Sequence, residues 1–291
     1  MRQRYDILHL RRGVAQSASA LRLGRRGRRF ESAHPDFFSK AQQSDRRVST
    51  PFLSLILPAH NEAKRLPQSL KQVQEFVNQQ TYDCEVLVVE NASTDETAGI
   101  VEDFQNEFSQ LKMIRLEQGG KGNAIRAGML AAQGQYRFMA DVDFSMPVAQ
   151  INLFLPPSIH QTQVAIASRE QNGSKRIGEP SYRHLIGRVY NFLVRFLVLP
   201  GLQETQCGFK CFSAEAAEQI FPKQTLEGWS FDVEVLAIAR ELGFEVVEVP
   251  ITWTYQAGSR MNILSDSWKM FKDLLLVRSN KRKGLYRGKA L

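Results

Sequence analysis

Residues 51–95 decide the fold, and they read PFLSLILPAHNEAKRLPQSLKQVQEFVNQQTYDCEVLVVENASTD. Within them, Phe52–Leu57 is apolar enough for a buried parallel strand, which Pro58 ends. A helical pattern follows over residues 66–80, and Glu85–Glu90 has the composition of a second buried strand. This order predicts a β-α-β unit.

The alternation continues toward the C-terminus. We expect helices over residues 95–108 and 121–132, and strands over residues 112–116 and 136–140. The second half predicts strands over residues 163–167, 208–212 and 245–249, and helices over residues 182–199, 214–220, 230–242 and 263–277. This alternation predicts an α/β fold, with a mostly parallel sheet covered by helices in a single domain over residues 51–278.

Polar residues stand where the expected strands of the first half end. In a parallel sheet, ligands bind at the carboxyl edge of the strands. Side chains far apart in the sequence should therefore meet in one crevice: Asn61, Glu62, Glu90, Asn91, Asp141 and Asp143.

The net charge of +8 is unevenly spread over the 291 residues. Residues 1–50 hold 12 of the 38 Lys and Arg residues but only 4 of the 30 Asp and Glu residues, so the rest of the chain is neutral. We interpret residues 1–50 as a basic disordered extension and residues 279–291 as a basic tail. The sequence leaves four interpretations of the extension open. They are a solvated segment without further function, a presequence, a nucleic-acid-binding arm and a segment attracted to anionic lipid.

Composition also bears on where the protein works. The 43% hydrophobic and 23% charged residues are typical of a globular protein. No window of 18 apolar residues is present, so we expect no transmembrane helix. The three cysteines lack paired spacing, which indicates a reducing compartment and argues against a zinc site. We therefore expect a cytoplasmic protein.

Two carboxylates follow the strand expected over residues 136–140, in the sequence Asp141-Val142-Asp143. Both can reach one divalent cation, directly or through water, and hold it against a diphosphate. Mg²⁺ and Mn²⁺ favour oxygen ligands and keep waters that phosphate oxygens can replace. Because surface loops contain such a pair by chance, the interpretation as a metal site depends on the surrounding motifs.

Those motifs are Pro58–Glu62, Glu90–Asp95, Gly119–Ala124, Glu204–Lys210 and Gly228–Glu234. With Asp141–Asp143 they resemble glycosyltransferase family 2, whose nucleotide-binding fold is called GT-A. The segments Glu204–Lys210 and Gly228–Glu234 resemble those of the family's dolichyl-phosphate glucosyltransferases. The resemblance covers roughly residues 52–278. It implies inverting transfer of a hexose, glucose by closest resemblance, from UDP-glucose to a polyprenyl or dolichyl phosphate at a membrane surface, with Mg²⁺ or Mn²⁺ as cofactor.

The resemblance also implies the donor site. The nucleotide sugar is expected on Pro58, His60, Glu62, Val89, Glu90, Asn91, Lys121, Asp141 and Val142, and the metal on Asp141 and Asp143. His60 stands where the family more often has tyrosine, and Asn91 where it usually has aspartate, so the base stays open. Lys121 either contacts the diphosphate or is a solvated lysine after a glycine turn. We expect the tryptophans in the core or at interfaces, with sugar stacking by Trp229 as the alternative.

On the acceptor side, Arg169 and Arg183 match family arginines that hold the acceptor phosphate, and Arg260 matches a position usually filled by lysine. Because a phosphate monoester is already anionic at neutral pH, the reaction needs no general base. Asp232 lies where members that glycosylate hydroxyls place their base. We expect it to have a positioning role, or to be a helix cap or structural carboxylate. The catalytic set is then Asp143, Asp232, Arg169 and Arg183.

The helices expected over residues 182–199 and 263–277 have apolar faces edged by basic residues, which suits an anionic membrane surface or a place against the sheet. Alternative functions are a family 2 transferase acting on a hydroxyl, and a sugar nucleotidyltransferase. The latter would need a Gly-rich, basic loop where Pro58–Glu62 stands. A third is nucleic-acid binding through the Arg-rich extension, against which the neutral charge of the folded part argues.

Overall fold

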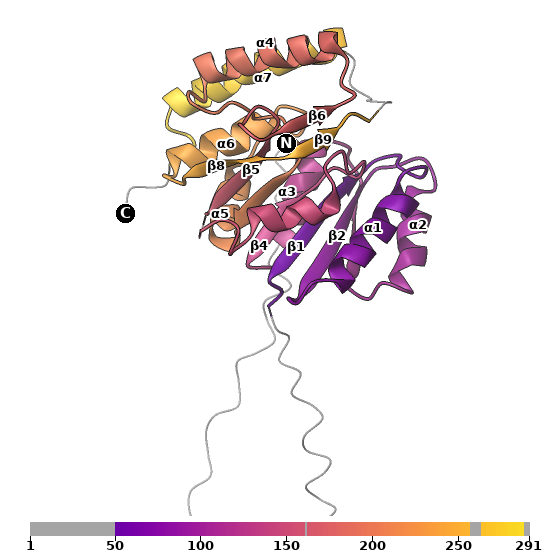
Figure 1. Cartoon of the computed structure of the whole chain (residues 1–291). Helices are drawn as coiled ribbons and strands as arrows, with labels where there is room; N and C mark the ends of the chain where they lie inside the picture. Colours follow the sequence, from indigo (N-terminus) through magenta and orange to yellow (C-terminus); the bar gives the residue numbers. More distant parts are fainter. Residues whose placement is uncertain (1–49, 161, 257–262, 288–291) are drawn as a thin grey trace, which may run out of the picture. The chain divides into compact units, whose positions relative to one another are not determined.

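The computed structural model describes residues 50–160, 162–256 and 263–287 (Figure 1). Apart from Thr50, the expected basic extension lies outside the described residues, and so does Arg260.

Within the described residues, seven strands form one sheet in the order β3-β2-β1-β4-β7-β5-β8. The strands β1 to β4 run parallel, β7 runs antiparallel between β4 and β5, and β8 pairs in parallel with β5. Their bounds are β1 Leu53–Ala59, β2 Cys84–Asn91, β3 Leu111–Leu116, β4 Tyr136–Met139, β5 Val164–Ser168, β7 Lys210–Ser213 and β8 Val246–Pro250. The prediction of a mostly parallel α/β sheet is confirmed.

Helices cover both faces of this sheet because its central strands are apolar on both sides (Figure 1). Leu55 and Leu57 of β1 belong to a core shared with α1 (Leu66–Asn78) and α2 (Thr97–Gln105). Ile56, which points to the other face, packs in a second core. That core is shared with α3 (Lys121–Ala131), α4 (Ser181–Leu197), α5 (Ala214–Ile220), α6 (Phe231–Glu241) and α7 (Ile263–Arg282).

Short elements that the sequence pattern did not predict complete the fold. Residues Val148–Phe154 form a 3₁₀ helix. The strands β6 (Lys175–Ile177) and β9 (Thr252–Thr254) pair in parallel as a separate small sheet. Figure 1 shows β6 and β9 between the large sheet and the helices α4 and α7, which lie side by side.

The C-terminal segment packs more closely than a solvated tail would. Helix α7, expected to end at Val277, continues to Arg282. Beyond it, Tyr286 is buried, and its hydroxyl donates a 2.9 Å hydrogen bond to Glu234 Oε1 on α6. Among the helices of the described residues, none is long and apolar enough to cross a membrane.

Candidate active site

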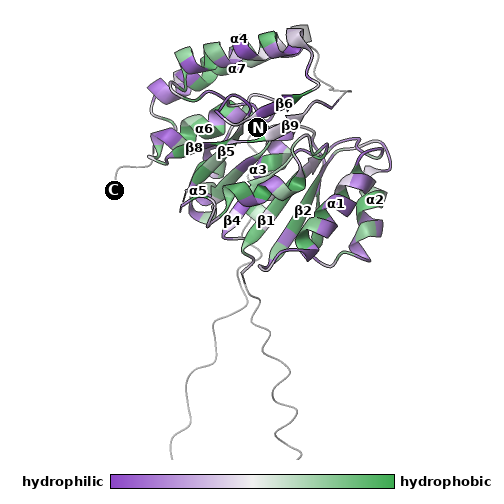
Figure 2. Cartoon of the chain, viewed as in Figure 1, coloured by the Kyte–Doolittle hydropathy of each residue, from purple (hydrophilic) through white to green (hydrophobic). Residues whose placement is uncertain are grey.

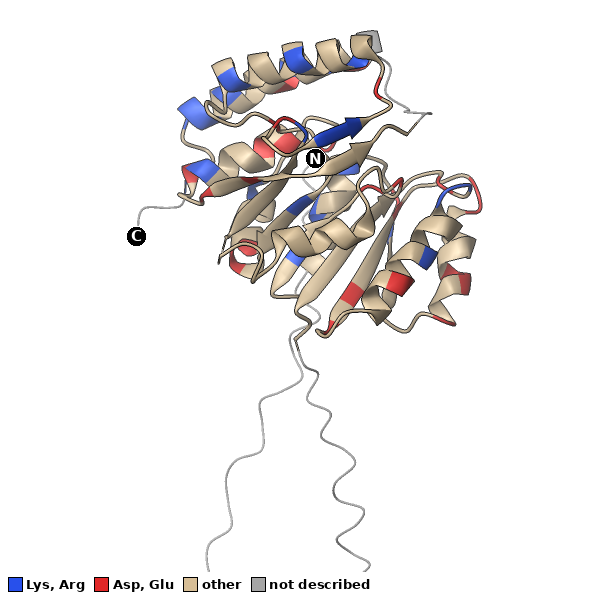
Figure 3. Cartoon of the chain, viewed as in Figure 1, with Lys and Arg blue, Asp and Glu red and all other residues tan. Residues whose placement is uncertain are grey.

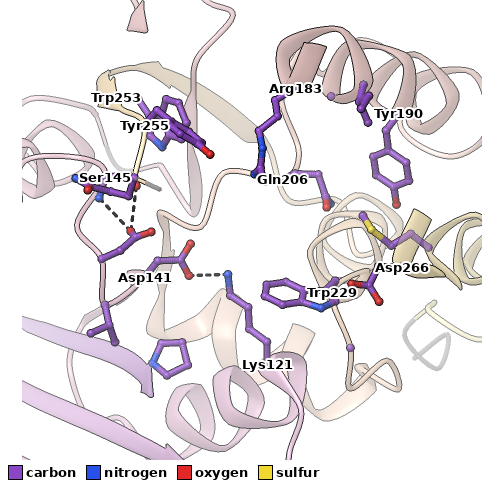
Figure 4. A pocket seen from close by; sticks show the side chains of 18 of the residues that line it. Lys121, Asp141, Ser145, Arg183, Tyr190, Gln206, Trp229, Trp253, Tyr255 and Asp266 are labelled. Carbon is purple, nitrogen blue, oxygen red and sulfur yellow. Dashed lines mark hydrogen bonds and ion pairs between the residues drawn. The ribbon is translucent and has the colours of Figure 1, made fainter. Parts of the chain in front are cut away.

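A cavity of about 690 Å³ opens at the carboxyl ends of β1, β2 and β4 and extends to α4 and α7 (Figure 4). Most of the predicted site residues line it together: Pro58, His60, Glu62, Asn91, Lys121, Asp141, Val142, Asp143, Arg169 and Arg183. Of the six strand-end residues expected to meet in one crevice, Glu62, Asn91, Asp141 and Asp143 line this cavity, whereas Asn61 and Glu90 do not.

Sharp turns at three strand ends direct these side chains into the cavity. Asn61 after β1, Ala92 after β2 and Phe144 after β4 have φ values of 51°, 54° and 40°. A non-glycine residue in this left-handed region costs on the order of 1 kcal/mol or more. Each of these strained residues directly follows a residue that lines the cavity: His60, Asn91 or Asp143.

The ends of β1 and β2 form the part of the cavity where the nucleoside is expected. His60 Nδ1 lies 2.7 Å from the carbonyl oxygen of Asn91, and because a carbonyl only accepts, this nitrogen has the proton. The side-chain Oδ1 of Asn91 is buried and has no hydrogen-bond partner among the described residues. An amide placed in this way can pair with the edge of a base.

Two predicted donor residues do not line the cavity. The side chain of Val89 is fully buried in the core, one strand step below Asn91 on the same face. Glu90 lies on the opposite face and accepts a 2.6 Å hydrogen bond from the backbone N–H of Ser93, which closes the turn after β2. Only Asn91 of this segment lines the cavity, because Glu90 points to the other face and Val89 lies deeper in the core.

Asp141 and Asp143 follow the end of β4 as the motif predicts, and both line the cavity. Figure 4 shows Asp141 pointing toward Lys121. Lys121, at the start of α3, places its Nζ 2.6 Å from Asp141 Oδ1. Asp143 Oδ1 accepts hydrogen bonds of 3.1 Å from both the backbone N–H and the hydroxyl of Ser145. Burial raises the pKa of Asp143, and the charge of Asp141 raises it further against the opposing bonds from Ser145.

The two carboxylates fit a divalent cation as a partial ligand set. The described residues contain no group of three or more His, Cys, Asp or Glu side chains arranged to hold a metal ion. Asp141 and Asp143 can supply two oxygen ligands, and their mutual repulsion favours a cation between them. The remaining positions around Mg²⁺ or Mn²⁺ would fall to water and to phosphate oxygens of a ligand.

Gly208 is a site residue that was not singled out from the sequence. A Cβ atom built on it would lie 1.9 Å from Asp141 Oδ2, so only glycine leaves room for that carboxylate. The glycine within the quoted motif Glu204–Lys210 was the available signal. The antiparallel strand β7, which begins at Lys210, brings this motif to the end of β4.

Asp232 lies behind the cavity wall rather than in it. It is buried, and its carboxylate accepts a hydrogen bond from the fully buried ammonium group of Lys210. Burial raises the pKa of Asp232, while the positive charges of Lys210 and Lys121 oppose that shift. Asp232 is therefore absent from the described lining of the cavity, and the positioning role expected for it stays a prediction.

The predicted acceptor arginines are each held against an aromatic ring. Arg169 donates a 2.7 Å hydrogen bond to Glu204, and its guanidinium lies 5.1 Å from the centroid of Trp253. The guanidinium of Arg183 lies 5.5 Å from the centroid of Tyr255, and its buried Nε has no hydrogen-bond partner among the described residues.

Both rings line the cavity, and Trp253 also packs against the core, where a tryptophan was expected. They are two residues apart at β9, and that spacing places them on one face. Trp229 also lines the cavity, with Lys121 Nζ 5.4 Å from its ring centroid.

Comparison with known proteins places the chain among transferases. The family model described as "Glycosyl transferase family 2" matches residues 54–221. The chain is 33% identical over 250 residues to the dolichyl-phosphate beta-glucosyltransferase of Mus musculus, covering 81% of this chain and 77% of that protein. It is 31% identical over 256 residues to the protein of the same name from Saccharomyces cerevisiae, again with 81% and 77% covered.

Solved structures share the fold at lower identity. Mannosyl-3-phosphoglycerate synthase from Rubrobacter xylanophilus has a TM-score of 0.60 and 16% identity, covering 83% of this chain and 77% of that one. Glucosyl-3-phosphoglycerate synthase from Mycobacterium tuberculosis, solved with Mn²⁺, UDP-glucose and phosphoglyceric acid, has a TM-score of 0.54 and 18% identity, with 80% of each chain covered. These likenesses show a shared fold.

Proposed function

The chain belongs to glycosyltransferase family 2, and on that basis we propose that it transfers glucose from UDP-glucose to a polyprenyl phosphate such as dolichyl phosphate, with inversion at the anomeric carbon. Residues 51–278 form the catalytic domain in this proposal. The names of its relatives in Mus musculus and Saccharomyces cerevisiae support the choice of glucose and of dolichyl phosphate.

One observation in the structure supports this function most directly. The same cavity has a carboxylate pair, Asp141 and Asp143, on one side and two arginines, Arg169 and Arg183, on the other. Carboxylates suit a cation bound to a diphosphate, and the planar forks of arginines suit a phosphate group. The cavity can therefore hold two phosphorylated ligands with a sugar between them.

The reaction is a single displacement. A phosphate oxygen of the acceptor forms a bond to the anomeric carbon, the bond from that carbon to UDP breaks, and the electron pair leaves with UDP. Arg169 and Arg183 orient the acceptor phosphate, which needs no deprotonation because its second pKa is about 6. Mg²⁺ or Mn²⁺ held by Asp141 and Asp143 would neutralise charge on the departing diphosphate. Lys121 and the α3 N-terminus add positive potential there.

A lipid acceptor also needs a path from a membrane, and α4 supports one. Only Asn191 and Val194 of α4 are buried. Large apolar side chains of α4 are exposed: Tyr182, Leu185, Val189, Phe192 and Phe196. Figure 2 shows hydrophobic and hydrophilic residues alternating along this helix. Figure 3 shows basic residues on both α4 and α7. Arg188 and Arg195 of α4 and Lys269 and Lys272 of α7 are exposed.

An apolar helix face edged by positive charge suits an anionic lipid surface. Because Ile186, Gly187 and Tyr190 of α4 line the cavity, an acceptor in the lipid could reach it directly. In this proposal the enzyme works on the membrane surface, bound through α4 and α7.

The proposal is tested by incubating the full chain with labelled UDP-glucose, Mg²⁺ or Mn²⁺, and vesicles containing either polyprenyl phosphate or the matching polyprenol. We expect labelled lipid only with the phosphate, and none after addition of a chelator. Asp143→Ala should abolish transfer, while Glu102→Ala, in an exposed ion pair with Arg115, should leave it unchanged. Transfer to the polyprenol would instead support a hydroxyl acceptor, and turnover that survives the chelator would contradict the metal role.

A further inference from the structure

Gln206 presents an unused amide to the cavity. It lies on the segment that leads into β7 and lines the cavity, near Arg183 and Tyr190 in Figure 4. Its Nε2 atom is buried and has no hydrogen-bond partner among the described residues. A buried amide without a partner destabilises the folded protein unless a ligand or water completes its bonds.

The backbone of Gln206 is fixed by the acceptor side of the cavity. Its N–H donates a 2.9 Å hydrogen bond to Glu204 Oε1, and the other oxygen of Glu204 accepts 2.7 Å from Arg169 Nε. Burial would raise the pKa of Glu204, but Arg169 and the backbone donors hold it at about 2. Glu204 is therefore ionised, and the arginine and Gln206 are held by one carboxylate.

Gln206 is also close in sequence to a residue that contacts the expected donor site. Gly208, two residues after Gln206, lies directly against the carboxylate of Asp141. The segment Glu204–Gly208 thus touches the arginine expected to orient the acceptor phosphate and the aspartate expected to hold the metal and diphosphate. The sugar that passes between those two phosphates must lie between these two contacts, which is where Gln206 stands.

We propose that the carboxamide of Gln206 hydrogen-bonds a hydroxyl of the transferred sugar and selects the sugar. This inference rests on the proposed function. An amide offers a donor and an acceptor together, which matches a sugar hydroxyl that both donates and accepts. It is uncharged, so it does not compete with the metal or with the phosphates. A site that hydrogen-bonds a hydroxyl discriminates strongly against ligands that lack it, because its own polar group is then left unpaired.

The test separates sugar contact from nucleotide contact. Calorimetric titrations of wild type and Gln206→Met, which keeps the side-chain length, are done in Mn²⁺ with UDP and with UDP-glucose. We expect the affinity for UDP to stay within twofold and the affinity for UDP-glucose to fall about tenfold, the size expected for one lost hydrogen bond. Equal melting temperatures of the two proteins check that folding is intact.

Other results overturn the inference. If both affinities fall together, Gln206 supports the site only structurally. If neither falls, or if only the KM for polyprenyl phosphate rises, the amide does not contact the sugar. Failure of the wild type itself to bind UDP or UDP-glucose in Mn²⁺ would refute the proposed function and, with it, the role of Gln206.

Discussion

Lys121 Nζ lies 2.6 Å from Asp141 Oδ1, on a carboxylate that is also a predicted metal ligand. Burial alone would lower the pKa of Lys121, but the charges of Asp141 and Asp232 raise it above its ordinary value, so the lysine is cationic. Gly122 holds the helix start in place through a 2.8 Å backbone bond to Glu227, and a Cβ on Gly122 would clash with Leu226. The ammonium group of Lys121 therefore contacts the same oxygen, Asp141 Oδ1, that would coordinate a divalent ion.

This competition gives the first prediction. In Lys121→Met, Mn²⁺ alone should bind several-fold more tightly than in the wild type, because the competing cation is gone. With UDP present the variant should lose this advantage. In the wild type Lys121 helps to bind the diphosphate, and Lys121→Met lacks that contact. Titration of free Mn²⁺ by electron paramagnetic resonance, with and without UDP, measures both effects. Weaker binding of Mn²⁺ alone in the variant would show that Lys121 does not compete for Asp141.

The second prediction concerns Gly208. Gly208→Ala should reduce transfer by at least 100-fold, because the new Cβ would stand 1.9 Å from Asp141 Oδ2 and must displace that carboxylate. The control is Gly99→Ala in α2, whose Cβ would meet only Glu96 at an ordinary 3.6 Å. Initial rates at saturating substrates compare the two variants. Full activity of Gly208→Ala would mean that Asp141 works from another position.

The third prediction is a pH dependence. The pKa of Glu204 is about 2, below its ordinary value of 4.5. A pKa that is lower in the folded state stabilises the protein above pH 4.5, and this stabilisation is lost as the pH falls from about 4.5 to about 2. Glu204→Gln should therefore unfold more easily than the wild type at pH 7, by on the order of 3 kcal/mol.

The gap between the two proteins should shrink as the pH falls through that window. Denaturant unfolding at a series of pH values between 7 and 3 measures it. Parallel stability curves for wild type and Glu204→Gln would mean that the Arg169–Glu204 pair does not respond to pH as the structure implies.

The fourth prediction concerns the exposed apolar face of α4. Phe192 and Phe196 are 65% and 76% exposed and stack on each other with centroids 6.4 Å apart. Replacing both by serine should weaken binding to anionic vesicles by at least tenfold. Burial of one phenylalanine side chain contributes about 1.5–3 kcal/mol to the binding free energy. Leu130→Ser, at an exposed apolar residue of α3, should have no effect. Sedimentation with vesicles distinguishes the two, and equal sedimentation would exclude α4 as the docking face.

The first half of the molecule could be predicted almost completely from the sequence. Buried parallel strands have long apolar runs, so the ends of β1, β2 and β4 could be located, and with them His60, Asn91 and Asp143. Of the neighbouring residues Val89, Glu90 and Asn91, all predicted to bind the nucleotide sugar, only Asn91 lines the cavity. Glu90 points to the other face of β2, and Val89, on the same face as Asn91, lies deeper in the core.

The acceptor side was harder to predict because it depends on contacts across the fold. The strands β6 and β9 have three residues each, too few for a periodic pattern, so the stacking of Trp253 under Arg169 was not anticipated. The pairing of Lys210 with Asp232 joins residues of a strand and a helix that no local pattern relates. Gln206 had no signal beyond its membership of a motif, since its unpaired amide is visible only in three dimensions.

Strand β7 runs against its neighbours, and this reversal has an evolutionary consequence. A parallel strand would end at the edge of the sheet where the cavity lies, whereas β7 begins there. The loop that precedes β7 therefore contributes to the cavity wall. Residues in such a loop can change without rebuilding the parallel strands beside it. Replacing the segment Glu204–Gly208 by that of a relative that uses a different sugar donor would then be expected to change the sugar specificity of the proposed transfer.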